Sequence, residues 1–258
     1  MEFVFKKKYG QNFLTNQTII NKIVQSIEPT NKDLIIEIGP GAGALSKRLK
    51  QYGTHLICYE IDQETRLYLD ELEDEHTHII YDDFLKRDIM SDIRAYDCNR
   101  IFVIGNLPYY ITTPIISKII TDKIPIYEAV FMVQKEVAER FVAKPNHREY
   151  GAITVFLNAY FHVSKLFDVS KNYFIPKPKV ESAVVKFTAK TEKAEIDYSK
   201  FSKIVKDSFQ FKRKTLKNNL KQYDTEKIEE ILKKNGYSLD HRAEEIPFSV
   251  FIEIASKF

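Results

Sequence analysis

The chain has 258 residues, of which 44% are hydrophobic and 13% aromatic, and its formal net charge is +3 at pH 7. This composition predicts a globular protein with one large domain of about 150 to 200 residues and a small second domain. No run of about 18 apolar residues occurs and the first eight residues lack the order of a signal peptide, so we expect a cytoplasmic protein without a membrane partner.

Short apolar runs alternate with segments of helical periodicity from residue 34 onward, which predicts strands joined by crossover helices. The predicted strands are residues 34–38, 55–60, 78–81, 101–104, 129–133, 165–169 and 183–187. Helices are expected at 44–52, 63–72, 113–121, 135–142 and 151–161. This alternation indicates an α/β fold with a mostly parallel sheet of seven strands, covered on both faces.

After the last predicted strand the pattern changes to helices alone, at residues 199–209, 213–221, 226–235 and 247–256. The third of these ends at Asn235-Gly236, a favourable helix stop. A polar and charged stretch at residues 189–198 separates the two patterns. We therefore expect an α/β domain of residues 1–190 and a small all-α domain of residues 191–258.

Charge is distributed unevenly along the chain. Eight basic residues lie between Lys200 and Lys221 against the single acidic Asp207, whereas residues 60–75 contain eight acidic side chains. A basic C-terminal end suits a polyanionic partner, and a solvated helix face is the alternative interpretation. The two cysteines, Cys58 and Cys98, lack metal-ligand spacing, so we expect reduced thiols and no metal site.

The first predicted strand leads into a glycine-rich segment, with glycines at 39, 41 and 43. Such a turn brings backbone N–H groups against a ligand at the start of a helix. Glu60 ends the second predicted strand about twenty residues later, where a carboxylate can accept the hydroxyl protons of a ribose. We therefore predict a nucleoside-type cofactor held by Gly39, Gly41 and Glu60, with Ile61 beside the carboxylate.

Two cofactors fit this pattern. Gly39-x-Gly41-x-x-Ala44 satisfies the relaxed dinucleotide fingerprint, which leaves NAD as an alternative. A methyl donor is favoured because a third glycine stands at position 43 and because Asp83, with Phe84 next to it, follows the third predicted strand, where a carboxylate could hold an adenine amino group. The alternative role for Asp83 is that of a turn residue.

The segment Asn106-Leu107-Pro108-Tyr109 follows the fourth predicted strand. It therefore lies at the carboxyl ends of the strands, where α/β proteins bind ligands. An exocyclic adenine nitrogen is a poor nucleophile because its lone pair is delocalised into the ring. The Asn106 side-chain oxygen and the Leu107 carbonyl can accept hydrogen bonds from its two N–H groups. Pro108 fixes Leu107 in an extended conformation. Such preorganised dipoles favour the reactive geometry without a general base.

Two aromatic side chains are candidates for holding the target base. Tyr109 offers a flat face on which an unstacked base can lie. Phe174 precedes a proline-containing loop, Ile175-Pro176-Lys177-Pro178-Lys179, and could cover the opposite face of the base. The alternative for Phe174 is a core position.

The chain resembles, over almost its whole length, the bacterial small-subunit ribosomal RNA adenine dimethyltransferases. The resemblance is carried by residues 10–14 (GQNFL), 37–45 (EIGPGAGAL), 105–114 (GNLPYYITTP) and 132–138 (MVQKEVA). Residues 211–220 (FKRKTLKNNL) and 241–244 (HRAE) are similar to this family and not to the macrolide-resistance methyltransferases of large-subunit rRNA, which share the Asn-x-Pro-Tyr core. Two departures are Lys177, where a proline is expected, and Lys212, where an arginine is expected.

The resemblance implies a Rossmann-like class I methyltransferase fold and S-adenosyl-L-methionine as cofactor. It implies that Asn12 and Leu14 close over the cofactor, that Gly39, Glu60 and Asp83 hold it, and that Asn106 joins cofactor and target. The implied reaction is N6,N6-dimethylation of two adjacent adenosines near the 3′ end of 16S rRNA in an assembling 30S subunit, and no feature predicts more than a monomer. We expect phosphate contacts from four basic residues, Lys212, Arg213, Lys214 and Lys217.

Two other functions compete with this one. A dinucleotide-dependent oxidoreductase is motivated by the ambiguous glycine spacing. An RNA-binding assembly factor that keeps the fold without catalysis is motivated by the basic C-terminal helices, although the intact sequence from Asn106 to Tyr109 argues against lost catalysis.

Overall fold

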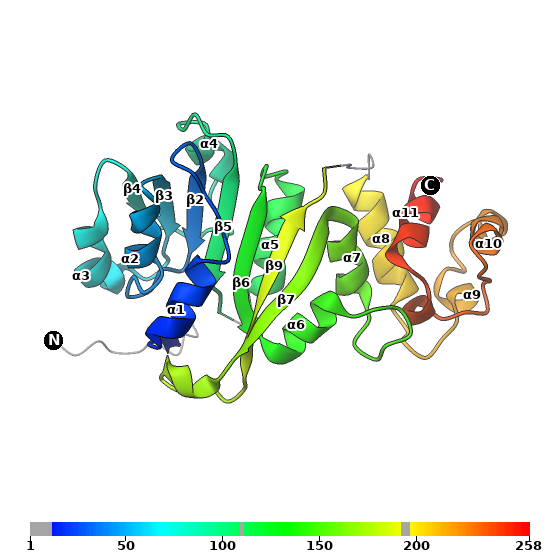
Figure 1. The fold of residues 1–258 in the computed structure, drawn as a ribbon. Helices are drawn as coiled ribbons and strands as arrows, with labels where there is room; N and C mark the ends of the chain where they lie inside the picture. The colour runs from blue at the N-terminus through cyan, green and yellow to red at the C-terminus, as the bar shows by residue number, and fades with distance from the viewer. Residues whose placement is uncertain (1–11, 109–110, 192–196) are drawn as a thin grey trace. The chain divides into compact units, whose positions relative to one another are not determined.

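The computed structural model describes residues 12–108, 111–191 and 197–258. The chain forms two compact units (Figure 1). The first reaches Lys135 and resumes at Ser164–Thr188, and the second contains Glu136–Val163 and Ala189–Phe258. The predicted division into domains of residues 1–190 and 191–258 stays a prediction. In the structure, residues 136–163 group with the C-terminal helices.

A seven-stranded sheet dominates the first unit, in the order β4-β3-β2-β5-β6-β9-β7. Strands β2, β3, β4, β5 and β6 are parallel neighbours, and β9 pairs antiparallel with β6. This confirms the predicted mostly parallel sheet. The strand bounds are β2 (Leu34–Ile38), β3 (His55–Tyr59), β4 (Thr77–Ile80), β5 (Ile101–Asn106), β6 (Glu128–Gln134), β7 (Phe161–Val169) and β9 (Ser182–Ala189).

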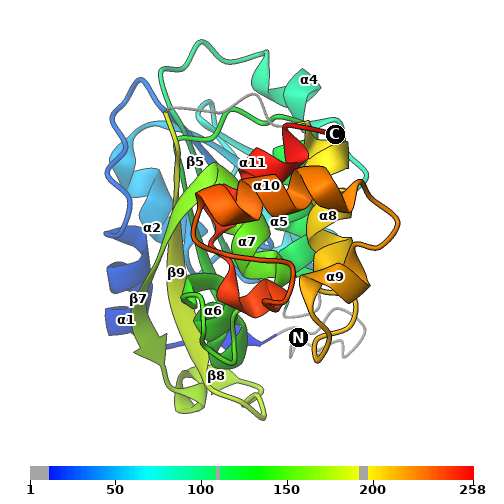
Figure 2. The ribbon, with the colours of Figure 1, turned by 90° about the vertical axis from the view of Figure 1, so that its right-hand side faces the viewer.

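Helices cover both faces of this sheet. In Figure 2, α1 (Gln17–Val24) and α2 (Ser46–Leu49) lie on one face, and α4 (Ile89–Ile93) and α5 (Thr112–Thr121) lie on the other. All five residues of β2 are buried as a result, although Glu37 among them is ionisable. Fully covered parallel strands read as continuous apolar runs, which is why their positions could be predicted.

Several short elements differ from the sequence prediction. Helix α1 begins where the Asn16 side chain accepts a hydrogen bond from the Ile19 N–H at 3.0 Å, and its buried face is Ile20, Ile23 and Val24. The predicted helix 44–52 is a single α-turn, α2, followed by a 3₁₀ turn at Lys50–Tyr52. Two two-residue strands, β1 (Phe13–Leu14) and β8 (Phe174–Ile175), pair antiparallel outside the main sheet.

The second unit is helical. Its helices are α6 (Lys135–Val142, whose first residue belongs to the first unit), α7 (Ala152–Tyr160), α8 (Tyr198–Ser208), α9 (Leu216–Asn219), α10 (Thr225–Lys234) and α11 (Phe248–Ala255). Phe156 of α7 stacks on Phe201 of α8, and the buried Tyr150 hydroxyl donates to the Ile246 carbonyl at 2.9 Å. Within the three described stretches, no helix is long and apolar enough to cross a membrane.

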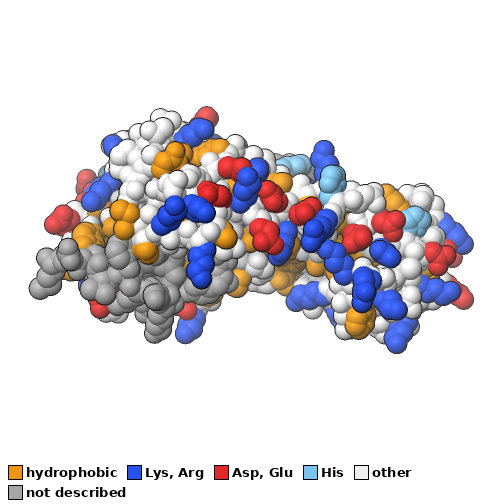
Figure 3. Space-filling view, turned by 90° about the horizontal axis from the view of Figure 1, so that it is seen from below, with side chains coloured by type: hydrophobic (Ala, Val, Ile, Leu, Met, Phe, Trp, Pro, Cys, Tyr) orange, Lys and Arg blue, Asp and Glu red, His pale blue; other side chains and the backbone are white. Residues whose placement is uncertain are grey.

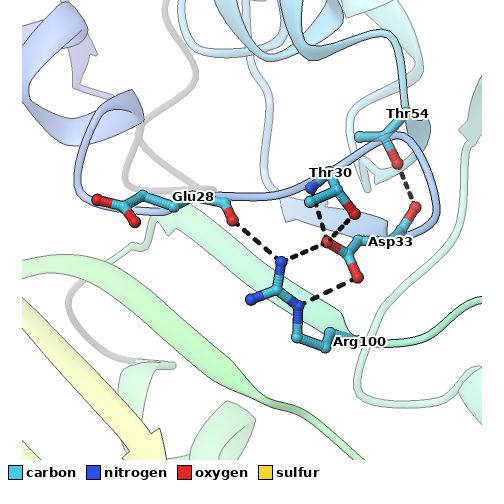
Figure 4. Close-up of polar contacts among 5 residues, drawn as sticks. All are labelled: Glu28, Thr30, Asp33, Thr54 and Arg100. Carbon is cyan, nitrogen blue, oxygen red and sulfur yellow. Dashed lines mark hydrogen bonds and ion pairs between the residues drawn. The ribbon is translucent and has the colours of Figure 1, made fainter.

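An ion pair joins the residues that precede β2 and β5 (Figure 4). Arg100 donates through Nη2 to Asp33 Oδ2 at 2.7 Å and through Nε to Asp33 Oδ1 at 3.2 Å. Thr30 donates to the same carboxylate through its backbone N–H and its hydroxyl. Arg100 Nη2 also donates to the Glu28 backbone carbonyl. The Thr54 hydroxyl donates to the Asp33 backbone carbonyl. Burial alone would raise the pKa of Asp33, but the hydrogen bonds from Arg100 and Thr30 hold that pKa below its usual value.

Replacing Arg100 with alanine should destabilise the protein, because Asp33 is only 1% exposed and would lose its charged partner. We expect a loss of about 2 to 3 kcal/mol in the free energy of unfolding. Arg100→Lys should recover part of that loss, since it keeps the charge but not the two-pronged geometry. Urea denaturation measures the effect, with the exposed Arg94→Ala as control. An Arg100→Ala protein as stable as the control would contradict a stabilising role.

Candidate functional site

A pocket of about 310 Å³ opens at the carboxyl ends of the central strands. Strand order reverses between β2 and β5, because the chain proceeds from β2 outward to β4 and then returns to β5 on the other side of β2. A crevice forms where neighbouring connections diverge in this way, and open α/β sheets bind ligands there. The pocket walls come from residues 12–14, 37–41, 44–45, 59–61, 82–85, 106–108, 111 and 115.

The glycine-rich turn forms the wall after β2. Gly41 has a left-handed backbone with φ of 59°, and its N–H donates to Glu60 Oε2 at 2.9 Å. A Cβ on Gly41 would lie 2.5 Å from the ring of Phe13, so the ring packs directly on the glycine backbone. A Cβ on Gly39, by contrast, would meet no protein atom within 4 Å. The open space beside Gly39 is a cradle that a ligand can fill.

Glu60 is 5% exposed and lies between the glycine turn and the residues after β3. Its Oε1 accepts the Asp62 N–H at 2.9 Å, while Oε2 accepts the Gly41 N–H. Burial raises the pKa of Glu60, although these backbone hydrogen bonds act in the opposite direction. Each carboxylate oxygen can accept more than one hydrogen bond, so Glu60 retains acceptor capacity for ligand hydroxyls.

Glu37 is a second buried carboxyl in the pocket wall, only 1% exposed, near the end of β2. Burial raises its pKa to about 7, and the neighbouring Glu60 contributes in the same direction. The Cys58 thiol donates to Glu37 Oε2 at 3.6 Å. Among the residues that the structure describes, neither Glu37 nor Glu60 has a lysine or arginine partner.

The described walls of the pocket contain four acidic side chains, Glu37, Glu60, Asp82 and Asp83, and no basic one. Outside the walls, Arg87 Nη1 lies 3.5 Å from Asp82 and Lys86 Nζ lies 3.9 Å from Asp83. The excess of carboxyl groups favours a cationic ligand over an anionic one. A dinucleotide would bring a pyrophosphate against these carboxyls, whereas a sulfonium nucleoside would bring a positive charge.

The residues after β3 and β4 form the side of the pocket opposite the glycine turn. Ile61 is 46% exposed, an unusual degree for a large apolar side chain, and it lies beside the pocket where a flat ring can cover it. Phe84 is buried and meets Tyr59 edge to face, with ring centroids 5.4 Å apart. Asp83 Oδ1 accepts the Leu85 N–H at 3.0 Å, so Asp83 lines the pocket while also stabilising the local turn.

Asn106 is the last residue of β5 and lines the pocket together with the glycine turn. Its side-chain NH₂ donates to the Asn12 backbone carbonyl at 2.9 Å. A carbonyl can only accept, so this bond fixes which end of the amide is nitrogen. The Asn106 side-chain oxygen is thereby left as an acceptor, and its predicted role toward the target base stays a prediction. Asn12 and Leu14 also line the pocket.

Gly105 allows β5 to pass close to the end of β2. A Cβ on Gly105 would lie 2.6 Å from the Ile38 backbone carbonyl oxygen, so no side chain fits there. Leu107 and Pro108 continue from this point into the pocket wall, with the Leu107 side chain buried. Tyr109, predicted to hold the target base, lies outside the described residues.

The structure places Phe174 away from the pocket walls. Its side chain is 3% exposed and belongs to the hydrophobic core beneath the sheet face covered by α1 and α2. It pairs through β8 with Leu14, and it does not line the pocket. Phe174 therefore occupies a core position, the alternative considered from sequence, and its role in covering the target base stays a prediction.

The four basic residues predicted to contact phosphate lie in the second unit. Lys212, Arg213, Lys214 and Lys217 are all exposed, and the Lys212 ammonium donates to the Arg148 carbonyl at 3.0 Å. Figure 3 shows lysine and arginine side chains gathered on the face of this unit that it views. The predicted helix 213–221 is shorter than expected, since α9 begins only at Leu216.

Known proteins resemble the chain along its whole length. Residues 2–258 match the family model described as ribosomal RNA adenine dimethylase. The chain belongs to this family. A ribosomal RNA small subunit methyltransferase A of Onion yellows phytoplasma is 41% identical over 100% of this chain and 97% of the relative. A protein of the same name from Mycoplasma mobile is 39% identical over 97% of each chain.

Two solved structures share the fold of this dimethylase. A dimethyladenosine transferase from Plasmodium falciparum superposes with a TM-score of 0.78 at 22% identity, over 95% of this chain and 97% of that one. The 23S rRNA methyltransferase ErmE superposes with a TM-score of 0.71 at 21% identity, over 95% of this chain and 99% of that one. Together they confirm the Rossmann-like methyltransferase fold.

Family membership decides between the cofactors left open by the glycine spacing. The dimethylase is an S-adenosyl-L-methionine-dependent rRNA adenine dimethyltransferase, not a dinucleotide oxidoreductase. The pocket agrees with this assignment, since two of its carboxyls, Glu37 and Glu60, have no described basic partner and the space beside Gly39 is open, as a cationic nucleoside requires. Sequence reasoning did not single out two residues of this site, Phe13 over the glycine turn and the buried Glu37.

Gly105→Ala should weaken cofactor binding in the dimethylase, because the added methyl would collide with the Ile38 carbonyl and displace the end of β2. We also expect the free energy of unfolding to fall by about 1 to 3 kcal/mol. Calorimetric titration with S-adenosylmethionine and urea denaturation measure the two effects. Gly151→Ala is the matched control, since a Cβ there meets nothing within 4 Å. Unchanged binding in Gly105→Ala would show that this close approach does not position the pocket.

Glu37→Gln should stabilise the cofactor-free dimethylase at high pH. The folded state is penalised when the buried carboxyl is charged, so the variant should gain on the order of 3 kcal/mol above pH 7. The gain should shrink as pH falls toward the ordinary pKa of 4.5 and vanish below it, where the folded and unfolded chains both hold the protonated form.

Urea denaturation across this pH range measures the gain, with the exposed Glu71→Gln as control. In calorimetric titration, the affinity of the wild-type protein for S-adenosylmethionine should rise as Glu37 becomes charged, and that of Glu37→Gln should not. A difference in stability between the wild-type protein and Glu37→Gln that does not vary with pH would contradict a raised pKa for Glu37.

Proposed function

We propose that this dimethylase converts two adjacent adenosines near the 3′ end of 16S rRNA to N6,N6-dimethyladenosine during assembly of the 30S subunit, working as a monomer. The small-subunit substrate is supported by the printed names of the relatives, which are ribosomal RNA small subunit methyltransferases A. The observation that carries the mechanism is the Asn106 amide, whose nitrogen is engaged by Asn12 and whose oxygen is left at the pocket.

The cofactor-binding residues in this proposal are Asn12, Leu14, Gly39, Gly41, Glu60, Ile61, Asp83, Phe84 and Asn106, all of which line the pocket. Glu60 accepts the ribose hydroxyls, and Asp83 accepts from the adenine amino group of the cofactor. Ile61 and Phe84 offer apolar surface to its adenine ring. S-adenosylmethionine supplies a methyl group made electrophilic by its bond to a positively charged sulfur.

Asn106 and Leu107 act on the target base. In the first transfer, the Asn106 side-chain oxygen and the Leu107 carbonyl accept hydrogen bonds from the two N–H groups of N6. The nitrogen thereby becomes pyramidal, and its lone pair, no longer delocalised into the ring, faces the methyl group. Pro108 keeps Leu107 extended, and Tyr109 supplies a stacking face. After the methyl group is attached, the surplus proton on N6 is acidic enough to pass to water, so these residues need not include a base.

Asn106→Ala should lower the rate of methyl transfer by about 10²- to 10³-fold, as expected for loss of one preorganised hydrogen-bond partner. Asn106→Asp should also fail, because a carboxylate cannot donate to the Asn12 carbonyl. Single-turnover transfer of labelled methyl groups to 30S particles that lack the modification measures the rate. The control is Asn172→Ala, in an exposed 3₁₀ turn. Undiminished transfer by Asn106→Ala would remove this mechanism.

The substrate is tested by mass spectrometry of 16S rRNA from a strain in which the gene is deleted. We expect two dimethyladenosines near the 3′ end to be missing, and to return when the wild-type gene but not the Asn106→Ala gene is supplied. Loss of a modification from 23S rRNA instead would overturn the small-subunit assignment. Light scattering of the purified protein measures its mass in solution and so tests whether it is a monomer.

Lys212, Arg213, Lys214 and Lys217 are the proposed phosphate contacts. Their exposure and the absence of an acidic partner for any of them among the described residues support this role. Residues 191–258 would accordingly contribute an RNA-binding surface to the enzyme. Affinity that depends on phosphate contacts falls steeply with salt.

A further inference from the structure

Phe211 is an exposed aromatic residue on the second unit. Its side chain is 56% exposed, and no other phenylalanine in the described ranges has this degree of exposure. Tyr127, also exposed, has the Arg100 guanidinium over its ring and Phe102 at its edge, whereas no described ring or cation lies against Phe211. The ring therefore contributes little to the core, and its face is open to a partner.

The backbone that carries Phe211 is held firmly. Asn219, 3% exposed, accepts the Phe211 N–H through Oδ1 at 3.3 Å and donates through Nδ2 to the Phe211 carbonyl at 3.3 Å and to the Ser208 carbonyl at 2.7 Å. The Lys214 N–H also donates to the Phe211 carbonyl, at 2.9 Å. Phe209, two residues earlier, packs on Phe251 with ring centroids 5.8 Å apart. One ring of this turn is therefore anchored while the other is presented to solvent in a preorganised position.

Positive charge surrounds the exposed ring. Lys212, Arg213 and Lys214 follow Phe211 directly, and the Lys212 contact with the Arg148 carbonyl brings that arginine's segment alongside. Four basic side chains here are exposed: Arg148, Lys212, Arg213 and Lys214. None of them forms an ion pair with a described acidic residue. An apolar protein partner would leave these charges unmatched, whereas a nucleic acid offers both phosphates for the cations and a flat base for the ring.

We propose that Phe211 is a stacking platform for an unpaired nucleobase of RNA, with the neighbouring cations on the flanking phosphates. The inference rests on the proposed function in taking rRNA as the partner. It adds that the second unit contacts a single-stranded or looped segment, because bases within a duplex do not expose a face. The base bound here is recognised by stacking and not by hydrogen bonds, so this contact fixes position without selecting sequence.

The chain contains no tryptophan, so Phe211→Trp introduces a single tryptophan at the proposed platform, which can be excited selectively over the tyrosines. We expect single-stranded oligoadenylate to quench its emission on binding, and a blunt RNA duplex or inorganic polyphosphate to leave it nearly unchanged. Leu67→Trp, at a side chain 67% exposed in the first unit, is the control and should not be quenched. Equal quenching by oligoadenylate and duplex, or equal quenching in the control, would overturn the proposal.

Salt dependence separates stacking from charge. Phe211→Ala and Phe211→Leu should weaken oligoadenylate binding by roughly 5- to 150-fold at every salt concentration, with the slope of affinity against salt unchanged. Lys214→Ala should instead reduce that slope by about one. Thermal unfolding confirms that each variant is folded.

An unchanged affinity in Phe211→Ala, or a loss accompanied by a changed slope, would count against stacking. These readouts use purified protein and oligonucleotide, so they stand even if the small-subunit substrate proves wrong. Absence of methylation by the wild-type protein would in turn refute the proposed function without bearing on quenching.

Discussion

The close approach of β2 and β5 at their carboxyl ends is the constraint on which the site depends. Only hydrogen fits between the Cα of Gly105 and the Ile38 carbonyl, so the strands remain adjacent up to the point where their chains turn apart. The glycine turn and Asn106 are thereby brought to one edge of the sheet. At the opposite ends of the same two strands, the pair of Asp33 and Arg100 joins the segments that enter them. The central strand pair is thus fixed at both ends.

The Asn106 amide connects this edge to a segment almost a hundred residues earlier in the chain. Its bond to the Asn12 carbonyl orients the amide and simultaneously holds the short strand β1 beside the pocket. Phe13 of that strand lies on Gly41, and Leu14 enters the core. Residues 12–14 therefore orient the Asn106 amide and cover the glycine turn. This explains how a segment with little secondary structure of its own can belong to the site.

Periodicity predicted the main sheet well because buried parallel strands are continuous apolar runs, as in β2 and β5. The glycine turn and Glu60 were also recognisable, since backbone geometry and a ribose acid require particular residues at a particular spacing. Sequence could not decide between the two positions considered for Phe174, because its burial accompanies a two-residue pairing with β1, some 160 residues away. Glu37 reads as an ordinary member of a glycine motif, and only the folded chain shows that it is buried without a cation nearby. Assignment of Asn12 and Leu14 came from resemblance, since no spacing rule links them to the pocket.

The unbalanced carboxyls of the pocket also bear on how the enzyme completes a double modification. Donating the methyl group leaves the sulfur of the spent nucleoside uncharged, and a pocket whose described walls carry four carboxyl side chains and no basic one would favour the charged donor over the neutral remnant. An enzyme that must reload before adding a second methyl to the same nitrogen gains from walls that hold the charged donor and release the neutral remnant.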